Sequence, residues 1–212
     1  MSKRLPRKRL RYGKVSFSDP AFRPYVGALG QLALSWNALH ETMAFLFCSV
    51  MGGGYSNQFL AVWHALKSDR SQRDILLAAT ESHMNPAYSP QFVSDIKWLC
   101  GRADAVEDVR NDALHSPLVG VQLGQTITVR PVTGLGHVRA SKLAQRELLR
   151  EFRWCRDMAL ILGAFAADVD ASLSDITKPW PDRPKLPERE HPSETTPPPQ
   201  ARTSKHPRPP QS

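Results

Sequence analysis

Arg110 and His115 stand five positions apart in the stretch VRNDALHSP, and both side chains suit chemistry on phosphate. Cleavage of RNA by its own 2′-hydroxyl needs a group that moves protons near neutral pH, and imidazole is the natural choice. It also needs a fixed cation for the charge that develops on the phosphorus, which a guanidinium fork supplies. Asn111 and Asp112 can support the phosphate or the imidazole. The stretch is therefore a candidate site for phosphodiester cleavage without a metal.

The helix that carries this stretch must end close to His115. Pro117 disfavours helical geometry at Ser116, so His115 lies in the last turn, where the helix dipole favours its protonated form. On an ideal helix, five residues separate Arg110 from His115 by about 140° around the axis and about 7.5 Å along it. One helix does not place them on one stripe, whereas two copies facing each other would gather two Arg and two His in one cleft.

A purely structural interpretation of the same residues stays open. Arg110 would then form an ordinary ion pair with Glu107, Asp108 or Asp74, and such a pair contributes little to stability. His115 would cap the end of the helix. The stretch would in that case be a charged helix end without chemistry.

Other kinds of active site find no support in the sequence. There is no Gly-rich phosphate loop between a strand and a helix, no HExxH pair and no GxSxG elbow. We therefore expect neither a metal nor a cofactor. Four tryptophans fall at helical spacing among apolar neighbours and are expected in the core rather than as base-stacking platforms: Trp36, Trp63, Trp98 and Trp154.

Positive charge is concentrated outside the middle of the chain. The formal net charge is +8, yet residues 15–174 hold fourteen basic and fifteen acidic residues. Residues 1–14 hold seven basic residues and no acid, which suits non-specific contact with nucleic acid, although such an arm can also be a merely solvated terminus. Arg70 and Arg73 are a further pair that would line an RNA cleft or belong to a solvated face. The candidate RNA-binding residues of the arm are Lys3, Arg4, Arg7, Lys8 and Arg9.

Apolar spacing of three and four predicts helices over most of the middle of the chain. The expected helices span 24–51, 57–67, 70–83, 91–115 and about 140–173. The stretch 118–132 alternates and is rich in Val and Thr, so it forms either a β-hairpin or a loop over the cleft. We predict an all-α fold, a bundle of four to five helices with disordered tails. If 118–132 is a hairpin, it is a small insertion before the last helix.

Three parts of the chain follow from this pattern. Residues 1–22 form a basic flexible arm, 23–174 the helical domain, and 175–212 a Pro-rich disordered tail that holds eleven of the eighteen prolines. Three isolated cysteines predict buried free thiols rather than disulfides or zinc: Cys48, Cys100 and Cys155. No secretory signal and no apolar run long enough to span a membrane are found, so a cytoplasmic protein without a membrane partner is expected.

The motif RNDALH at 110–115 resembles the signature of the HEPN superfamily (higher eukaryotes and prokaryotes nucleotide-binding domains). That signature is an Arg followed by a polar residue and, after four to six residues, a His at the end of a late helix. The resemblance covers about residues 24–174, but its specific part is six residues. It departs from one subgroup, in which a Tyr modified by a nucleotidyltransferase antitoxin follows the His, because Ser116 and Pro117 stand here.

The resemblance implies a homodimeric, metal-independent endoribonuclease for single-stranded RNA, in a toxin–antitoxin or phage-defence role. Arg110 and His115 would be catalytic and Asn111 supportive, and an antitoxin would be a further partner. One alternative is a non-catalytic helical module on the same scaffold that binds nucleotide, RNA or protein. Another is an accessory protein whose two tails do the binding.

Overall fold

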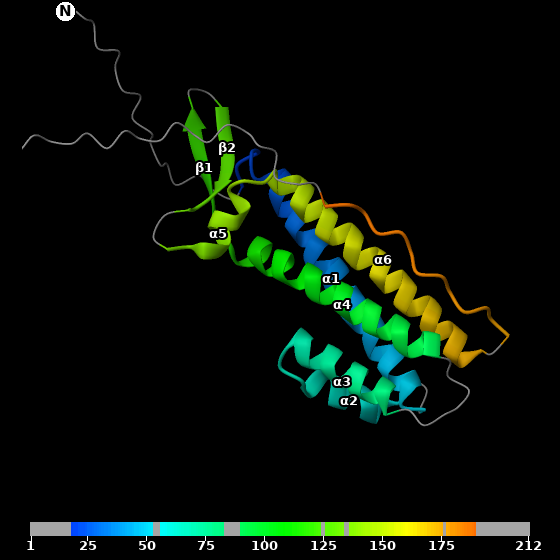
Figure 1. The fold of residues 1–212 in the computed structure, drawn as a ribbon. Helices are drawn as coiled ribbons and strands as arrows, with labels where there is room; N and C mark the ends of the chain where they lie inside the picture. Colours follow the sequence, from blue (N-terminus) through cyan, green and yellow to red (C-terminus); the bar gives the residue numbers. More distant parts are fainter. Residues whose placement is uncertain are drawn as a thin grey trace, which may run out of the picture.

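A computed structural model describes residues 18–52, 56–82, 90–123, 126–133, 136–175 and 177–189 of the chain. Within these ranges the chain forms six helices and one two-stranded sheet, which confirms the expected helical bundle with a small hairpin (Figure 1). The helices are α1 (Arg23–Val50), α2 (Asn57–Ala65), α3 (Asp69–Glu81), α4 (Pro90–His115), α5 (Val138–Leu143) and α6 (Leu148–Ser174). The strands are β1 (Leu118–Leu123) and β2 (Thr126–Pro131).

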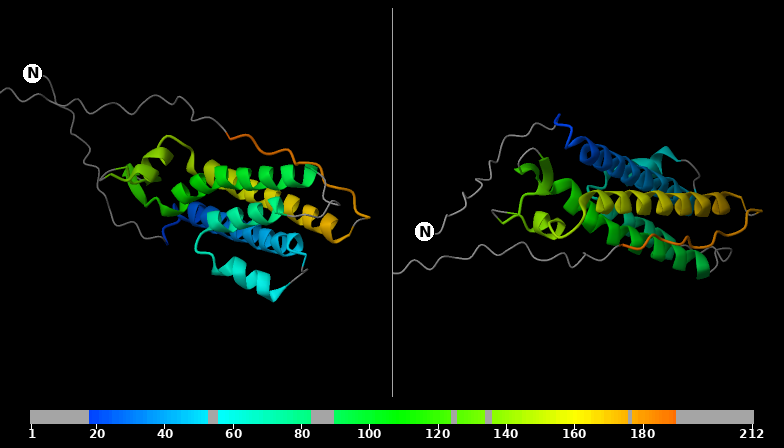
Figure 2. Two further views of the ribbon diagram at one scale, coloured as in Figure 1. Left: turned by 60° about the horizontal axis from the view of Figure 1, so that its bottom comes forward. Right: turned by 90° about the horizontal axis from the view of Figure 1, so that it is seen from above.

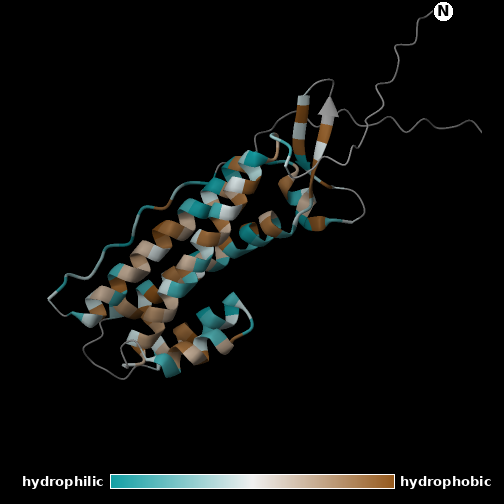
Figure 3. Ribbon diagram, turned by 180° about the vertical axis from the view of Figure 1, so that it is seen from behind, coloured by the Kyte–Doolittle hydropathy of each residue, from teal (hydrophilic) through white to brown (hydrophobic). Residues whose placement is uncertain are grey.

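The core lies between the three long helices. α1 packs along α6, α4 packs against α6, and α3 closes the gap between α1 and α4. Hydrophobic residues recur along each helix beside hydrophilic ones, so that each helix turns an apolar stripe inward (Figure 3). Fully buried side chains of this core include Leu32, Trp36, Leu39, Phe92, Ile96, Phe152 and Leu162.

The starts of the helices follow ordinary capping chemistry. Pro24 occupies the first turn of α1, where its missing N–H costs nothing. The Ser68 hydroxyl accepts a hydrogen bond from the Ser71 amide and caps α3, as the sequence predicts.

The predicted last helix is divided in two. The sequence indicates one helical stretch from about 140 to 173, whereas α5 ends at Leu143 and α6 begins at Leu148. The physical reason is a capping contact: the Glu147 carboxylate accepts hydrogen bonds from the amides of Leu149 and Arg150, at 3.2 and 2.7 Å. The break turns α5 away from α6 and creates a corner beside α4.

The segment after α4 is a hairpin rather than a loop. β1 and β2 pair antiparallel, with Leu118 opposite Pro131 and Leu123 opposite Thr126. The hairpin stands at the end of the bundle beside α5 (Figure 1). Part of the predicted Leu-Gly-Gln turn, residues 124 and 125, lies outside the described residues.

The sequence predicts a disordered or extended chain from residue 175, and residues 177–189, which we call the strap, are extended. After α6 the chain reverses, and the strap runs back along the side of α4 and α6 (Figures 1 and 2). It is extended, as its prolines require, but side chains anchor it: Trp180 packs edge-on against Phe92, and Trp154 of α6 donates a hydrogen bond to the Pro187 carbonyl. Residues 190–212 lie outside the described residues.

Other predictions also fall on residues outside the described ranges. Most of the basic arm, residues 1–17, is among them, together with its five candidate RNA-binding residues. In the part of the chain that is described, no helix is long and apolar enough to cross a membrane.

Candidate functional site

Arg110 is held on the side of α4 that faces α1 and α3. Its guanidinium lies over the ring of Trp36, 5.4 Å from the ring centroid, and 3.8 Å from a carboxylate oxygen of Asp69. Its Nη1 donates to the Asn111 side-chain oxygen at 2.8 Å. Asp69 in turn accepts a hydrogen bond from the Trp36 indole at 2.7 Å. The Asn111 side chain is thus in direct contact with Arg110, while its expected support of a phosphate or of the imidazole stays a prediction.

The guanidinium of Arg110 is ordered but not fully satisfied. Its side chain is 20% exposed, and its Nε–H is buried without a hydrogen-bond partner among the described residues. A buried donor without a partner costs free energy. Because this N–H is itself inaccessible, a ligand can reach only the exposed part of the guanidinium. The ion-pair partner is Asp69, which is none of the three partners that the structural interpretation names.

Arg73 is buried, so it lines neither an RNA cleft nor the solvated face that was the other expectation. Its side chain is 1% exposed and reaches from α3 to α4, where it donates to the carboxylates of Asp104, at 2.6 and 2.9 Å, and of Glu107. The reason is spacing: Asp104 and Glu107 are three residues apart, so both lie on the α4 face that meets α3. Arg70, by contrast, is exposed, as either interpretation requires.

His40 completes this buried network and is neutral. Its Nε2 lies 3.1 Å from Nη1 of Arg73, and because a guanidinium only donates, Nε2 must accept. The proton is then on Nδ1, which donates to the Trp36 carbonyl at 3.2 Å. Burial lowers the pKa of His40 below its ordinary value, and it outweighs the opposite effect of Asp69. His40 is therefore a structural acceptor at neutral pH.

His115 lies in the last turn of α4, as predicted, and its side chain is exposed. It makes no hydrogen bond or ion pair with another described residue, in contrast to Arg110. Asp108, Asp112 and His115 are spaced at four and three, so they share one stripe of α4 that is rotated away from Arg110. The structure thus brings Arg110 and Asn111 together and leaves His115 on another face of the helix.

Asp112 belongs to the stripe of His115 and not to the surroundings of Arg110. It is buried, and one of its carboxylate oxygens lies 3.3 Å from the ammonium of Lys142 on α5. Asp112 therefore lies apart from Arg110, and the expectation that it supports the phosphate or the imidazole stays a prediction. Its contact is with the corner that the break between α5 and α6 creates.

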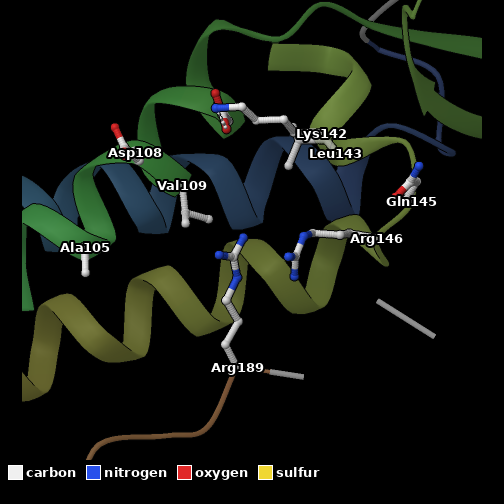
Figure 4. Close-up of a pocket in the computed structure, with 9 residues that line it drawn as sticks. Ala105, Asp108, Val109, Lys142, Leu143, Gln145, Arg146 and Arg189 are labelled. Carbon is white, nitrogen blue, oxygen red and sulfur yellow. Dashed lines mark ion pairs between the residues drawn. The ribbon is translucent and has the colours of Figure 1, made fainter. Parts of the chain in front are cut away.

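A cavity of about 430 Å³ opens at this corner, between α4, α5, the turn before α6 and the end of the strap. Its charged lining consists of Asp108 and Asp112 from α4, Lys142 from α5, Arg146 from the turn before α6, and Arg189 from the strap. The guanidinium groups of Arg146 and Arg189 come from different segments and lie next to each other (Figure 4). This volume is within the range of small-molecule sites.

The two guanidinium groups share one buried carboxylate. Glu151 of α6 is 6% exposed; one of its oxygens accepts from Arg146 at 2.8 Å, and the other accepts from Arg189 at 2.8 and 3.0 Å. Arg189 also lies over the Trp154 ring, 5.3 Å from its centroid. Sequence reasoning missed this group, because Arg189 is 38 residues from Glu151 and lies in a stretch whose composition indicates disorder.

The remaining predicted residues take structural positions. Trp36 and Trp63 are fully buried, while Trp98 and Trp154 are partly buried against the core, so the prediction of a core role is confirmed. All three cysteines are buried free thiols, as expected. In the described part of the chain, no group of three or more His, Cys, Asp or Glu side chains could hold a metal ion.

Comparison with known proteins adds no relative. No protein-family model, no curated protein and no solved structure matches the chain.

Proposed function

We propose that the protein is a metal-independent endoribonuclease that cleaves single-stranded RNA and works as a homodimer. The observation that carries the proposal is the contrast between the two motif residues. Arg110 is a fixed, incompletely satisfied cation, and His115 is an exposed imidazole with no partner among the described side chains. An imidazole that moves protons and a fixed cation are the two groups that the reaction needs.

In the proposed reaction, the substrate supplies its own nucleophile. The ribose 2′-hydroxyl loses its proton to a base and attacks the adjacent phosphorus, forming the 2′-oxygen–phosphorus bond. The bond from phosphorus to the 5′-oxygen breaks, and that oxygen takes a proton. The products are a 2′,3′-cyclic phosphate and a 5′-hydroxyl. His115 moves a proton, and Arg110 stabilises the charge on the phosphorane.

A second copy of the chain has a defined part in this proposal. Arg110 and His115 lie on different faces of α4, so one copy does not direct both at the same phosphate. A two-fold partner would present its own His115 to the Arg110 of the first copy and supply the second proton-transfer group. The active species is then the dimer, and a monomeric variant has no activity.

One observation favours a second candidate function, a binding module without catalysis. Arg110 is paired with Asp69 and stacked on Trp36, which are contacts that also suit a purely structural cation. Under this alternative, changes at Arg110 alter stability or binding, and the wild-type protein never cuts RNA.

The test is cleavage of end-labelled single-stranded RNA in EDTA by the wild-type protein, His115→Ala, Arg110→Ala and Arg110→Lys. We expect each variant to lose about 100-fold or more in rate, the lysine variant included, because an ammonium lacks the planar donor fork. His64→Ala and Arg153→Ala are matched controls, since both side chains are exposed and lie on α2 and α6. Cleavage that persists in His115→Ala would refute the proposed role of the motif.

A further inference from the structure

We propose that the cavity at the corner of α4, α5 and α6 is a phosphate-binding site. Lys142 and Arg189 would be the donors, and the ligand would be a phosphate group carried either by a free nucleotide or by an RNA strand. The sequence does not indicate this site, and the proposal rests on the cavity's own side chains rather than on the proposed cleavage of RNA.

The first argument is the balance of charge on the wall formed by α6 and the strap. Arg146 and Arg189 both donate to the single carboxylate of Glu151, so the two guanidinium groups divide one buried acid between them. Because Glu151 is almost fully buried, both of its oxygens are used inside the protein. An anion that enters the cavity therefore meets two guanidinium groups that share the one negative charge of Glu151.

The second argument is the supply of hydrogen-bond donors. Arg189 uses Nε and Nη2 on Glu151, which leaves Nη1 for a ligand, and its side chain is 34% exposed. Lys142 is 61% exposed and uses one contact, at 3.3 Å, on Asp112. A phosphate group has several acceptor oxygens, so it can take donors from both residues at once.

The third argument is that the cationic geometry is fixed from three separate elements. Lys142 is on α5, Arg146 is in the turn before α6, and Arg189 is on the strap (Figure 4). The strap is held in register by the contacts of Trp180 and Pro187 with the bundle, so Arg189 is brought to the cavity by tertiary packing. Preorganised donors bind an anion with less loss of entropy than mobile ones.

The acidic residues of the cavity provide a substitution that should strengthen phosphate binding instead of weakening it. Asp112 is compensated by Lys142, whereas Asp108 is exposed and makes no hydrogen bond or ion pair with another described residue. Asp108 therefore opposes an anion. Its replacement by Asn keeps the shape of the side chain and removes the charge, and binding of phosphate should become tighter.

The experiment is calorimetric titration of the full-length His115→Ala protein, a background chosen to prevent cleavage. The probes are inorganic phosphate, adenosine 5′-monophosphate and a short oligoribonucleotide without terminal phosphates. Lys142→Gln and Arg189→Gln should each weaken binding about tenfold, the usual worth of a charge-assisted hydrogen bond. Asp108→Asn should strengthen it about twofold, as expected for one exposed charge several ångströms away.

Two controls separate the site from general charge. Lys97→Gln removes an exposed, ion-paired Lys from α4, and Arg156→Gln removes a partly exposed, ion-paired Arg from α6. Neither should change affinity. Both cavity substitutions are at exposed or partly exposed side chains, and melting curves of each variant check that the fold is kept.

The probes distinguish the source of the phosphate. Binding of the mononucleotide or of inorganic phosphate that depends on Lys142 and Arg189 supports a site for a free phosphate. The same dependence with the oligoribonucleotide alone supports a site for a backbone phosphodiester. No binding of any probe, or binding unchanged by both substitutions, overturns the proposal. If the wild-type protein cleaves RNA but the cavity substitutions do not change phosphate binding, only the phosphate site is refuted. If phosphate binds through Lys142 and Arg189 but the wild-type protein does not cleave RNA, only the proposed nuclease is refuted.

Discussion

Replacement of Arg73 by Met is the substitution whose consequence the structure defines most clearly. The side chain is 1% exposed and joins α3 to α4 and α1 through Asp104, Glu107 and His40. Met fills a similar volume, so the change removes the charge and the five donors while leaving only a small cavity. The cost is then set by what happens to the three partners.

The partners differ in their access to water, and this sets the magnitude. Asp104 is 52% exposed, so its carboxylate rehydrates and contributes little. Glu107 is 22% exposed and keeps part of its desolvation cost, while the buried Nε2 of His40 loses its donor, which alone costs about 1–3 kcal/mol. We expect a loss of about 2–3 kcal/mol, less than the 3–5 kcal/mol typical of a fully buried broken pair.

The assay is urea unfolding followed by far-ultraviolet circular dichroism and by tryptophan fluorescence. The matched control is Arg70→Met, an exposed Arg three positions earlier on the same helix, for which we expect a change within about 0.5 kcal/mol. In the double variant Arg73→Met with Glu107→Gln, the unpaired charge is gone as well. Its destabilisation should therefore be smaller than the sum of the two single changes.

The refuting result is specific. If Arg73→Met is no more destabilising than Arg70→Met, the guanidinium is not buried between α3 and α4, and the interpretation of His40 as a neutral acceptor fails with it. Additive effects in the double variant would show that Arg73 and Glu107 do not interact.

Three further predictions follow from other buried groups. Asp95 is 1% exposed and accepts hydrogen bonds from Trp180 and Arg183 of the strap. Asp95→Asn should therefore lower the free energy of unfolding by about 1–2 kcal/mol and speed tryptic cleavage after Lys185. An unchanged cleavage rate would contradict the docking of the strap. Because burial lowers the pKa of His40 in the folded state, the unfolded chain binds its proton first, so stability should be constant above about pH 6.5 and fall below it. A His40→Gln protein with the same acid sensitivity would argue against this cause. Burial raises the pKa of Cys100 and of Cys155 to about 12, so neither thiol should react with a thiol reagent at pH 8 until urea unfolds the protein, and rapid labelling of either in the native state would be inconsistent with the packing.

The helices and the motif could be predicted because their signals are local. Apolar spacing located α1, α2, α3 and α4 to within a few residues, and Ser68 was recognised as a cap from its type and place. Pro117 ended α4 at His115 for a steric reason that operates within two residues. The alternation after it indicated the hairpin.

The break before α6 could not be predicted from the same kind of signal. The stretch KLAQRELLR contains no Gly or Pro and has the spacing of a continuous helix. It is interrupted because the Glu147 carboxylate turns back onto the first amides of α6, and Glu is not a usual residue for that position. Local helix propensity favours one continuous helix, whereas the capping contact of Glu147 favours a new helix start, and the structure has the new start.

The roles of Arg73 and of the strap depend on partners far away in the sequence. The carboxylates that bury Arg73 are 31 and 34 residues downstream, and the partner of Arg183, Asp95, is 88 residues upstream. A polar, proline-rich composition is typical of disorder, since it offers little apolar surface. Here two Arg and one Trp find buried acids and aromatic rings on α4 and α6. The candidate sites differ in the same way: a local motif singled out Arg110, whereas the cations of the cavity come together only in the fold and were missed.

The most direct test of the central claim is the incubation of purified protein with end-labelled single-stranded RNA in EDTA, beside the His115→Ala protein. The account predicts that only the wild-type protein cuts, and that the products carry 2′,3′-cyclic phosphate and 5′-hydroxyl ends. Cutting by both proteins at equal rates, or by neither when both are folded and dimeric, would contradict the claim that Arg110 and His115 form a ribonuclease site.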